Sequence, residues 1–193
     1  MNSFVDLWRV LIPGLWLLWI IVWSLAAIGA KRTQWRESLR EAVYNRFPLL
    51  LGIFLMIVPR WPLGFLAWRI VPNGFAAPLW GVALTAAGLL FTFWARWHLG
   101  GNWSGAVTVK QDHTLIVSGP YRWIRHPIYT GITTALFGTA LAVGTARAFV
   151  GAALMLIGFL IKLQVEEARM RETFPAEYAD YSRHTARLIP GVY

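Results

Sequence analysis

Residues 119–131 read Gly-Pro-Tyr-Arg-Trp-Ile-Arg-His-Pro-Ile-Tyr-Thr-Gly, and a long apolar segment follows them. Two arginines, a histidine and three aromatic residues are therefore held at the edge of a hydrophobic stretch. Pro127 suits the first position of a helix, and His126, as the residue before a proline, favours extended backbone, so a loop should end and a helix begin here. A helix start presents free N–H groups and the positive end of the helix dipole, which suit a carboxylate or a phosphate.

The composition places this stretch in a membrane protein. Of the 193 residues 57% are hydrophobic and only 14% are charged, and the apolar residues form long blocks, which excludes an ordinary soluble domain. The net charge of +9 does not indicate nucleic-acid binding, because the basic residues lie between apolar blocks. The absence of cysteine excludes disulfides, thiolate metal sites and cysteine nucleophiles.

Five apolar blocks predict five transmembrane helices. They are Val5–Gly29, Phe47–Val58, Ala76–Trp97, Ile128–Val143 and Ala148–Leu163. The second block is short, and the helical spacing of Leu39, Val43 and Phe47 predicts that its helix starts earlier. Trp61–Val71, which is flanked by prolines, should form an interfacial or partly re-entrant connection on the outer side.

The connections between these blocks carry further signals. Leu99–His126 should be a compact loop with a short hairpin. Only Gly144–Arg147 joins the last two blocks, which predicts a tight antiparallel helical hairpin. Its glycines and those of the third block favour close helix packing; they are Gly81, Gly88, Gly131, Gly138, Gly151 and Gly158. The last helix should leave the membrane, break near Phe174–Pro175 and continue as a short helix.

The distribution of basic residues predicts the orientation. With the N-terminus outside and the C-terminus in the cytoplasm, 14 of the 18 lysines and arginines lie on the inner side, and four lie on the outer side. The predicted fold is therefore an all-α integral membrane protein with about five transmembrane helices, a cytoplasmic cofactor-binding loop and a C-terminal helix. The same bias allows a plainer interpretation of residues 119–131, as a helix entrance whose arginines follow the positive-inside rule.

The helical hairpin also predicts a polar cluster. Tyr129 begins one helix and Lys162 and Glu166 end the other, so they should lie close in space. A carboxylate just inside a membrane helix end is costly without a partner or a ligand. The alternative is a simple lysine–glutamate pair four residues apart on one helix face.

Several motifs together resemble the isoprenylcysteine carboxyl methyltransferase family. In chain order they are Leu99-Gly100-Gly101-Asn102-Trp103-Ser104, His113-Thr114-Leu115, Gly119-Pro120-Tyr121, Arg125-His126-Pro127-x-Tyr129-x-Gly131, Glu166-Glu167, Phe174-Pro175-Ala176-Glu177-Tyr178-x-x-Tyr181 and Arg187-x-x-Pro190. The match covers roughly the C-terminal half, and the N-terminal helices agree only in hydropathy. The resemblance divides the chain into N-terminal helices and connection, residues 1–75, and a methyltransferase core, residues 76–193.

This resemblance implies an integral membrane methyltransferase that uses S-adenosylmethionine, in a prokaryotic inner membrane. The residues implied to line the cofactor pocket are His113, Thr114, Leu115, Ile116, Tyr121, His126, Pro127, Ile128, Tyr129 and Glu166. Lys162 stands where eukaryotic relatives have an arginine near the reacting substrate group, and a lysine keeps the charge but loses the planar fork.

The chemistry of the residues agrees with that cofactor. Its carboxylate suits the helix start at Pro127, and its sulfonium and ammonium suit Glu166 and the aromatic faces of Tyr121 or Tyr129. Arg125 or Lys162 would orient an anionic acceptor. His126 is the best-placed candidate base, although a histidine before a helix-opening proline equally often organises the backbone.

The expected acceptor is a lipophilic molecule that enters from the bilayer among membrane lipids, such as an isoprenylated thiol-adjacent carboxylate, a lipid amine, or a small hydrophobic thiol or acid. Neither a metal site nor a nucleic-acid partner is expected. Two alternatives stay open: an NADPH-dependent membrane reductase of the sterol-reductase type, and a noncatalytic membrane scaffold or transporter.

Overall fold

The computed structural model describes residues 7–28, 33–36, 39–57, 64–100, 108–110 and 115–191. Five long helices make up most of this part of the chain: α2 (Trp8–Ala27), α3 (Leu39–Ile57), α4 (Ala76–Leu99), α5 (Pro127–Val143) and α6 (Ala146–Thr173). They correspond to the five predicted apolar blocks. By length and hydropathy, α2, α4 and α6 could cross a membrane, whereas α3 and α5 carry the shorter apolar stretches Arg46–Ile57 and Pro127–Val143.

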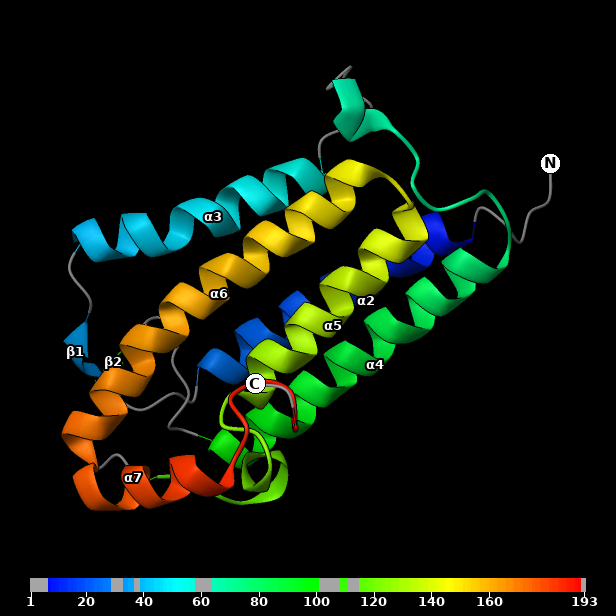
Figure 1. Cartoon of the computed structure of the whole chain (residues 1–193). Helices are drawn as coiled ribbons and strands as arrows, with labels where there is room; N and C mark the ends of the chain where they lie inside the picture. Colours follow the sequence, from blue (N-terminus) through cyan, green and yellow to red (C-terminus); the bar gives the residue numbers. More distant parts are fainter. Residues whose placement is uncertain are drawn as a thin grey trace.

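The helices form a bundle whose two ends differ. α5 and α6 run antiparallel, α4 lies along α5, and α3 lies along α6 (Figure 1). The short helix α7 (Pro175–His184) lies across the end where α5 begins and α6 ends, whereas the 3-10 turn η1 (Gly64–Ala67) lies at the other end (Figure 1). The predicted break near Phe174–Pro175 is confirmed, because α6 ends at Thr173 and α7 starts at Pro175.

Glycines bring the backbones of two helix pairs into contact. A Cβ added at Gly131 of α5 would lie 2.6 Å from the carbonyl oxygen of Gly88 on α4. A Cβ at Gly52 of α3 would lie 2.6 Å from the carbonyl oxygen of Gly151 on α6. The predicted close packing is confirmed, but the glycines of α5 and α6 face α4 and α3 and do not face each other. Such small residues allow close approach where lipid removes the hydrophobic drive for association.

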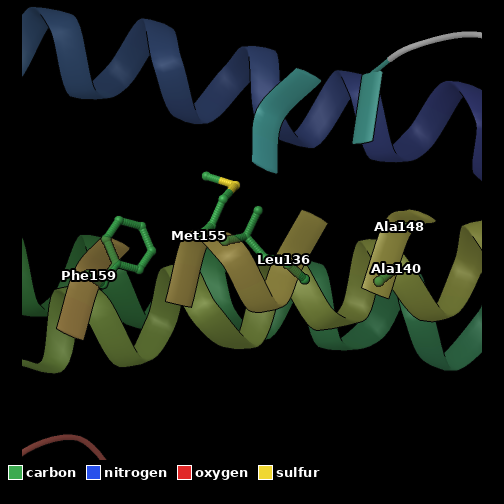
Figure 2. Packing of buried hydrophobic residues seen from close by; sticks show 6 residues of the cluster. Leu136, Ala140, Ala148, Met155 and Phe159 are labelled. Atoms are coloured by element: carbon green, nitrogen blue, oxygen red, sulfur yellow. The ribbon is translucent and has the colours of Figure 1, made fainter. Parts of the chain in front are cut away.

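The α5–α6 hairpin has an apolar interior of its own. Its buried cluster consists of Leu136, Ala140, Ala148, Ala152, Met155 and Phe159. Figure 2 shows the labelled members of this cluster, in which Ala140 and Ala148 lie together, with Leu136 of α5 and Met155 and Phe159 of α6 to one side of them. The turn itself is made by Gly144, whose φ of 73° is in the left-handed region.

Polar side chains attach α2 to this bundle. The indole N–H of Trp16 donates to Thr139 Oγ1 on α5 at 3.0 Å, and that of Trp19 donates to Thr92 Oγ1 on α4 at 2.7 Å. Arg96 of α4 donates from Nη2 to the carbonyl oxygen of Ala26 at 2.7 Å. This contact places a cation at the end of α2, where carbonyl groups lack partners within the helix.

Two other arginines do the same at the opposite end of the bundle. Arg69 donates to the carbonyl oxygen of Val143 at 3.1 Å, and Arg147 donates to that of Leu55 at 3.1 Å. They therefore interact with the C-terminal ends of α5 and α3. The segment after η1 also pairs with the α5–α6 turn, since the amide of Ile70 donates to the carbonyl of Gly144 at 2.9 Å.

One expectation about the inner loop was wrong. The sequence predicted a short hairpin within Leu99–His126, but β2 (Thr108–Lys110) pairs antiparallel with β1 (Thr33–Arg36) from the first loop. Residues 115–117 have no regular structure. Pairing between segments about 75 residues apart is not visible in local alternation.

We predict that Gly88→Ala destabilises the bundle, because the new Cβ would lie 2.6 Å from the amide nitrogen of Ala135 and α4 must move away from α5. Overpacking of this kind costs about 1–3 kcal/mol. Thermal unfolding of the detergent-purified protein measures the effect. Gly14→Ala on α2 is the matched control, since a Cβ at that position would have no other helix or neighbouring side chain within 4 Å. Equal unfolding temperatures for the two variants would contradict the assignment.

Candidate active site

The predicted helix start at Pro127 forms one side of the candidate site. His126 is the residue before the helix, with φ −126° and ψ 59°, and Pro127 occupies the first position of α5. Just upstream, the 3-10 turn η3 (Gly119–Arg122) begins at Gly119, which has a φ of 57° and packs against the ring of His98 on α4. A side chain at Gly119 would occupy the space of that ring, so this glycine holds the loop against α4.

The first polar cluster surrounds Glu166. The Tyr129 hydroxyl donates to Glu166 Oε1 at 2.7 Å, and Lys162 Nζ lies 3.9 Å from the same oxygen. The Lys162 ammonium also lies over the Tyr129 ring, 5.6 Å from its centroid. The predicted proximity of these three residues is confirmed. The Glu166 side chain keeps 22% of its surface exposed, so it is only partly buried.

Phe159 of α6 supports this cluster from the apolar side. Its ring centroid lies 5.1 Å from that of Tyr129. Tyr129 therefore has an apolar contact on one helix and a hydrogen bond to a carboxylate further along the same helix. The cluster lies where the hydrophobic interior of the hairpin ends.

The second polar cluster surrounds Glu167, whose side chain is only 4% exposed. Three donors reach Oε1: Arg125 Nε at 3.2 Å, His126 Nε2 at 3.1 Å and Arg187 Nε at 3.1 Å. Arg171 Nη2 reaches Oε2 at 3.1 Å. Glu167, Arg171 and Arg187 were not among the predicted site residues. The adjacent Glu166-Glu167 pair was visible in the sequence, but which arginines it contacts depends on the tertiary fold.

His126 joins the two clusters. Its Nε2 contacts Glu167 Oε1 at 3.1 Å, and its Nδ1 lies 3.8 Å from Glu166 Oε2. Because an ionised carboxylate only accepts hydrogen bonds, His126 donates from Nε2 to Glu167. The Nδ1 edge therefore faces the Glu166 side.

The segment that follows α7 closes the site from the C-terminal end. The amide of Arg125 donates to the carbonyl of Ala186 at 2.8 Å, and the hydroxyl of Thr130 donates to the carbonyl of Leu188 at 2.8 Å. Arg125 Nη1 also donates to the carbonyl oxygens of Ser182 and Thr185. Arg125 is thus engaged by Glu167 and by this segment, whereas Lys162 lies at Glu166.

The remaining predicted pocket residues are placed as follows. Tyr121 is buried, and its carbonyl accepts a hydrogen bond from the Tyr181 hydroxyl at 2.7 Å. Pro127 is buried, and Leu115, Ile116 and Ile128 are partly buried. His113 and Thr114 lie outside the described residues. Contact of these residues with a cofactor stays a prediction.

Burial raises the pKa values of three tyrosines around the site. It raises the pKa of Tyr121 well above its ordinary value, and the nearby Tyr181 and Glu166 raise it further. Burial also raises the pKa of Tyr178 and that of Tyr181, in the latter case against the opposing charge of Arg125. Within the described residues, no group of three His, Asp or Glu side chains is arranged to hold a metal ion.

The family model of the isoprenylcysteine carboxyl methyltransferase (ICMT) family matches residues 81–172. The protein-S-isoprenylcysteine O-methyltransferase of Saccharomyces cerevisiae is 34% identical over 94 residues, which cover 47% of this chain and 39% of that protein. The methanethiol S-methyltransferase of Mycobacterium tuberculosis is 34% identical over 190 residues, which cover 86% of this chain and 71% of that protein.

A solved structure shares the fold. The structure of the eukaryotic intramembrane Ras methyltransferase ICMT matches with a TM-score of 0.52 at 22% sequence identity, over 79% of this chain and 51% of that chain. The predicted helical membrane fold is thereby confirmed. The chain spans about two fifths of the yeast methyltransferase and about half of the solved structure.

The tyrosine environment gives a prediction for alkaline pH. Tyrosines of the unfolded chain ionise near pH 10, whereas Tyr121, Tyr178 and Tyr181 stay protonated in the folded protein. The unfolded state therefore loses protons first, so the free energy of unfolding should fall as the pH rises above about 10. The tyrosinate absorbance of the folded protein should show fewer than its six tyrosines titrating near pH 10. Ionisation of all six there, with the helical circular dichroism intact, would contradict this assignment.

Proposed function

This chain belongs to the isoprenylcysteine carboxyl methyltransferase family, and we propose that it transfers the methyl group of S-adenosylmethionine to a lipophilic acceptor at the cytoplasmic face of the membrane. One observation carries the proposal. The Glu166 carboxylate, with the Tyr129 hydroxyl 2.7 Å away and the Lys162 ammonium 3.9 Å away, lies at the junction of two apolar helices. Charged groups at such a position usually serve a ligand.

The residues fit the charges of that cofactor. Glu166 and the ring of Tyr129 already attract one cation, the Lys162 ammonium, so the same pair suits a sulfonium or a primary ammonium. The first N–H groups of α5, at Ile128 and Tyr129, suit a carboxylate at the helix start. When bound, S-adenosylmethionine supplies an electrophilic methyl group, and no metal is required.

The chain's own residues would then act by position. Tyr129 and Glu166 would hold the cofactor's cationic groups, and Lys162 would orient an anionic acceptor group beside them. Arg125 and His126 would organise the loop, since both already bind Glu167. The apolar side chains of α5 and α6, such as Phe159, would keep water away from the reacting groups, so that alignment and desolvation supply most of the catalysis.

The acceptor class has two candidates. The first is an S-prenylated cysteine carboxylate, as the names of the isoprenylcysteine methyltransferases indicate. The matches to the yeast and rat enzymes cover 47% and 55% of this chain. A small thiol follows from the methanethiol S-methyltransferase, whose match covers 86%. Because the thiolate is the reactive form of a thiol, the Lys162 ammonium would favour either acceptor's anion.

We further propose that residues 76–193 form the catalytic core and residues 1–75 its membrane support, with the N-terminus outside and the C-terminus inside an inner membrane. The cluster residues of α5, α6 and the C-terminal segment all lie beyond residue 75. Arg69 and Arg147 bind carbonyls at the opposite end of the bundle, which would be the outer side.

The first test is calorimetric titration of the detergent-purified protein with S-adenosylmethionine and, separately, with NADPH. We expect S-adenosylmethionine to bind and Glu166→Gln to weaken it by about tenfold or more, because a hydrogen-bonded charge pair is worth roughly 1.5–3 kcal/mol. Glu172→Gln is the matched control, since Glu172 is an exposed residue of α6 paired with Arg169. Binding of NADPH alone would indicate a reductase, and binding of neither would favour a scaffold or transporter.

The second test addresses Lys162 and the acceptor. Methyl transfer from labelled S-adenosylmethionine is measured with an S-prenylated cysteine derivative and with a short alkanethiol. With the acceptor that reacts, Lys162→Gln should raise the acceptor KM by about 10- to 100-fold, the value of one charged contact, and Lys162→Arg should recover much of the loss. An unchanged KM in Lys162→Gln would remove Lys162 from the acceptor site.

A further inference from the structure

We propose that Glu167 is a positioning residue for the cofactor site, which fixes the imidazole of His126 and holds the C-terminal segment against the start of α5. This inference rests on the proposed function, because the site it serves is the one assigned to S-adenosylmethionine. Glu167 itself is too enclosed to bind a ligand, with a side chain 4% exposed and both oxygens engaged.

The contacts of Glu167 join three parts of the chain. Its own helix, α6, supplies Arg171; the loop that enters α5 supplies Arg125 and His126; and the segment after α7 supplies Arg187. Three of these four donors converge on one oxygen, Oε1. The position of Glu167 therefore sets the relative placement of α6, the α5 entrance and the C-terminal segment.

Helix geometry explains why two adjacent acids have different roles. Consecutive residues of an α-helix point about 100° apart, so the side chains of Glu166 and Glu167 point to neighbouring but different sides of α6. Glu166 faces Tyr129 and Lys162, whereas Glu167 faces the arginines. His126 contacts both, and its Nε2–H bond to Glu167 is what turns its Nδ1 edge towards Glu166.

The contacts around Glu167 depend on its negative charge, which the substitution Glu167→Gln removes. Three arginines face the Glu167 carboxylate, and two of them, Arg125 and Arg187, are only 13% exposed. Removal of the Glu167 charge takes away the carboxylate that these guanidinium groups share, and Arg125 and Arg187 are poorly solvated. The loop with His126 and the segment with Arg187 are then expected to separate.

The test uses Glu167→Gln in detergent micelles, with three measurements. The Kd for S-adenosylmethionine should rise by about tenfold or more, because small displacements at a binding site have effects of that size. Amide exchange should accelerate in residues 185–188. The imidazole N–H signal of His126, identified among the four histidines by its loss in His126→Asn, should disappear or shift in the proton NMR spectrum.

Three variants control the result. Glu172→Gln removes an exposed carboxylate from the same helix and should change none of the three measurements. Glu167→Asp keeps the charge and should partly restore the affinity. In the double variant Glu167→Gln/His126→Asn the loss of affinity should be smaller than the sum of the two single losses, since Glu167 acts in part through His126. Additive losses would overturn the positioning role.

Other outcomes decide between a positioning and a merely structural role. A lower unfolding temperature with an unchanged Kd and an unchanged His126 signal would overturn the proposal. If Glu167→Gln does not fold, Arg187→Gln replaces it and should accelerate exchange in residues 185–188 and weaken binding by several-fold; no change in either would also overturn it. If the unaltered protein fails to bind S-adenosylmethionine, the proposed function fails, while exchange and the His126 signal still test Glu167.

Discussion

Two adjacent carboxylates on α6 hold the open end of the α5–α6 hairpin together. Gly144 closes the hairpin at one end, and at the other Glu166 bonds Tyr129 while Glu167 bonds Arg125 and His126. Packing of apolar helix faces against each other contributes little free energy when the surrounding lipid is equally apolar. These polar contacts and the close glycine contacts between helices therefore determine how the helices are placed. The candidate site exists because α5 begins where α6 leaves the apolar region.

The sequence was sufficient to predict the helices and the α5–α6 hairpin, but not which helices the glycines bring together. Apolar length marks a helix whatever it packs against, so blocks such as Ala76–Trp97 and α4 agree closely. The glycines predicted close packing, but the short turn suggested α5 against α6, whereas Gly88 meets Gly131 and Gly52 meets Gly151 across other helix pairs. The partner of residues 108–110 was also missed, because strand pairing over a long separation leaves no local pattern.

In the candidate site too, some residue contacts could be predicted from the sequence and others could not. Tyr129, Lys162 and Glu166 could be brought together from the sequence because the hairpin topology alone makes the two helix ends neighbours. Arg187 could not, because its approach to Glu167 depends on the turn at Phe174 and on the path of the chain after α7. The sequence can therefore predict a contact between residues at the two ends of a single helical hairpin. It cannot predict the position of a residue such as Arg187, which is reached only after two further changes of chain direction.

The arginines show why net charge alone is a poor guide to function in this chain. Arg69, Arg96 and Arg147 each donate to a carbonyl oxygen at or near the C-terminal end of a helix, where both the helix dipole and the lack of intrahelical partners favour a cation. The backbone of a membrane protein requires such partners, because lipid cannot supply them. Lys162 differs in that its charge faces a carboxylate and an aromatic ring, groups that would also attract a cationic ligand. These three arginines are therefore explained by the helix ends whose carbonyl groups they bind, whereas the charge of Lys162 meets side chains of the candidate site.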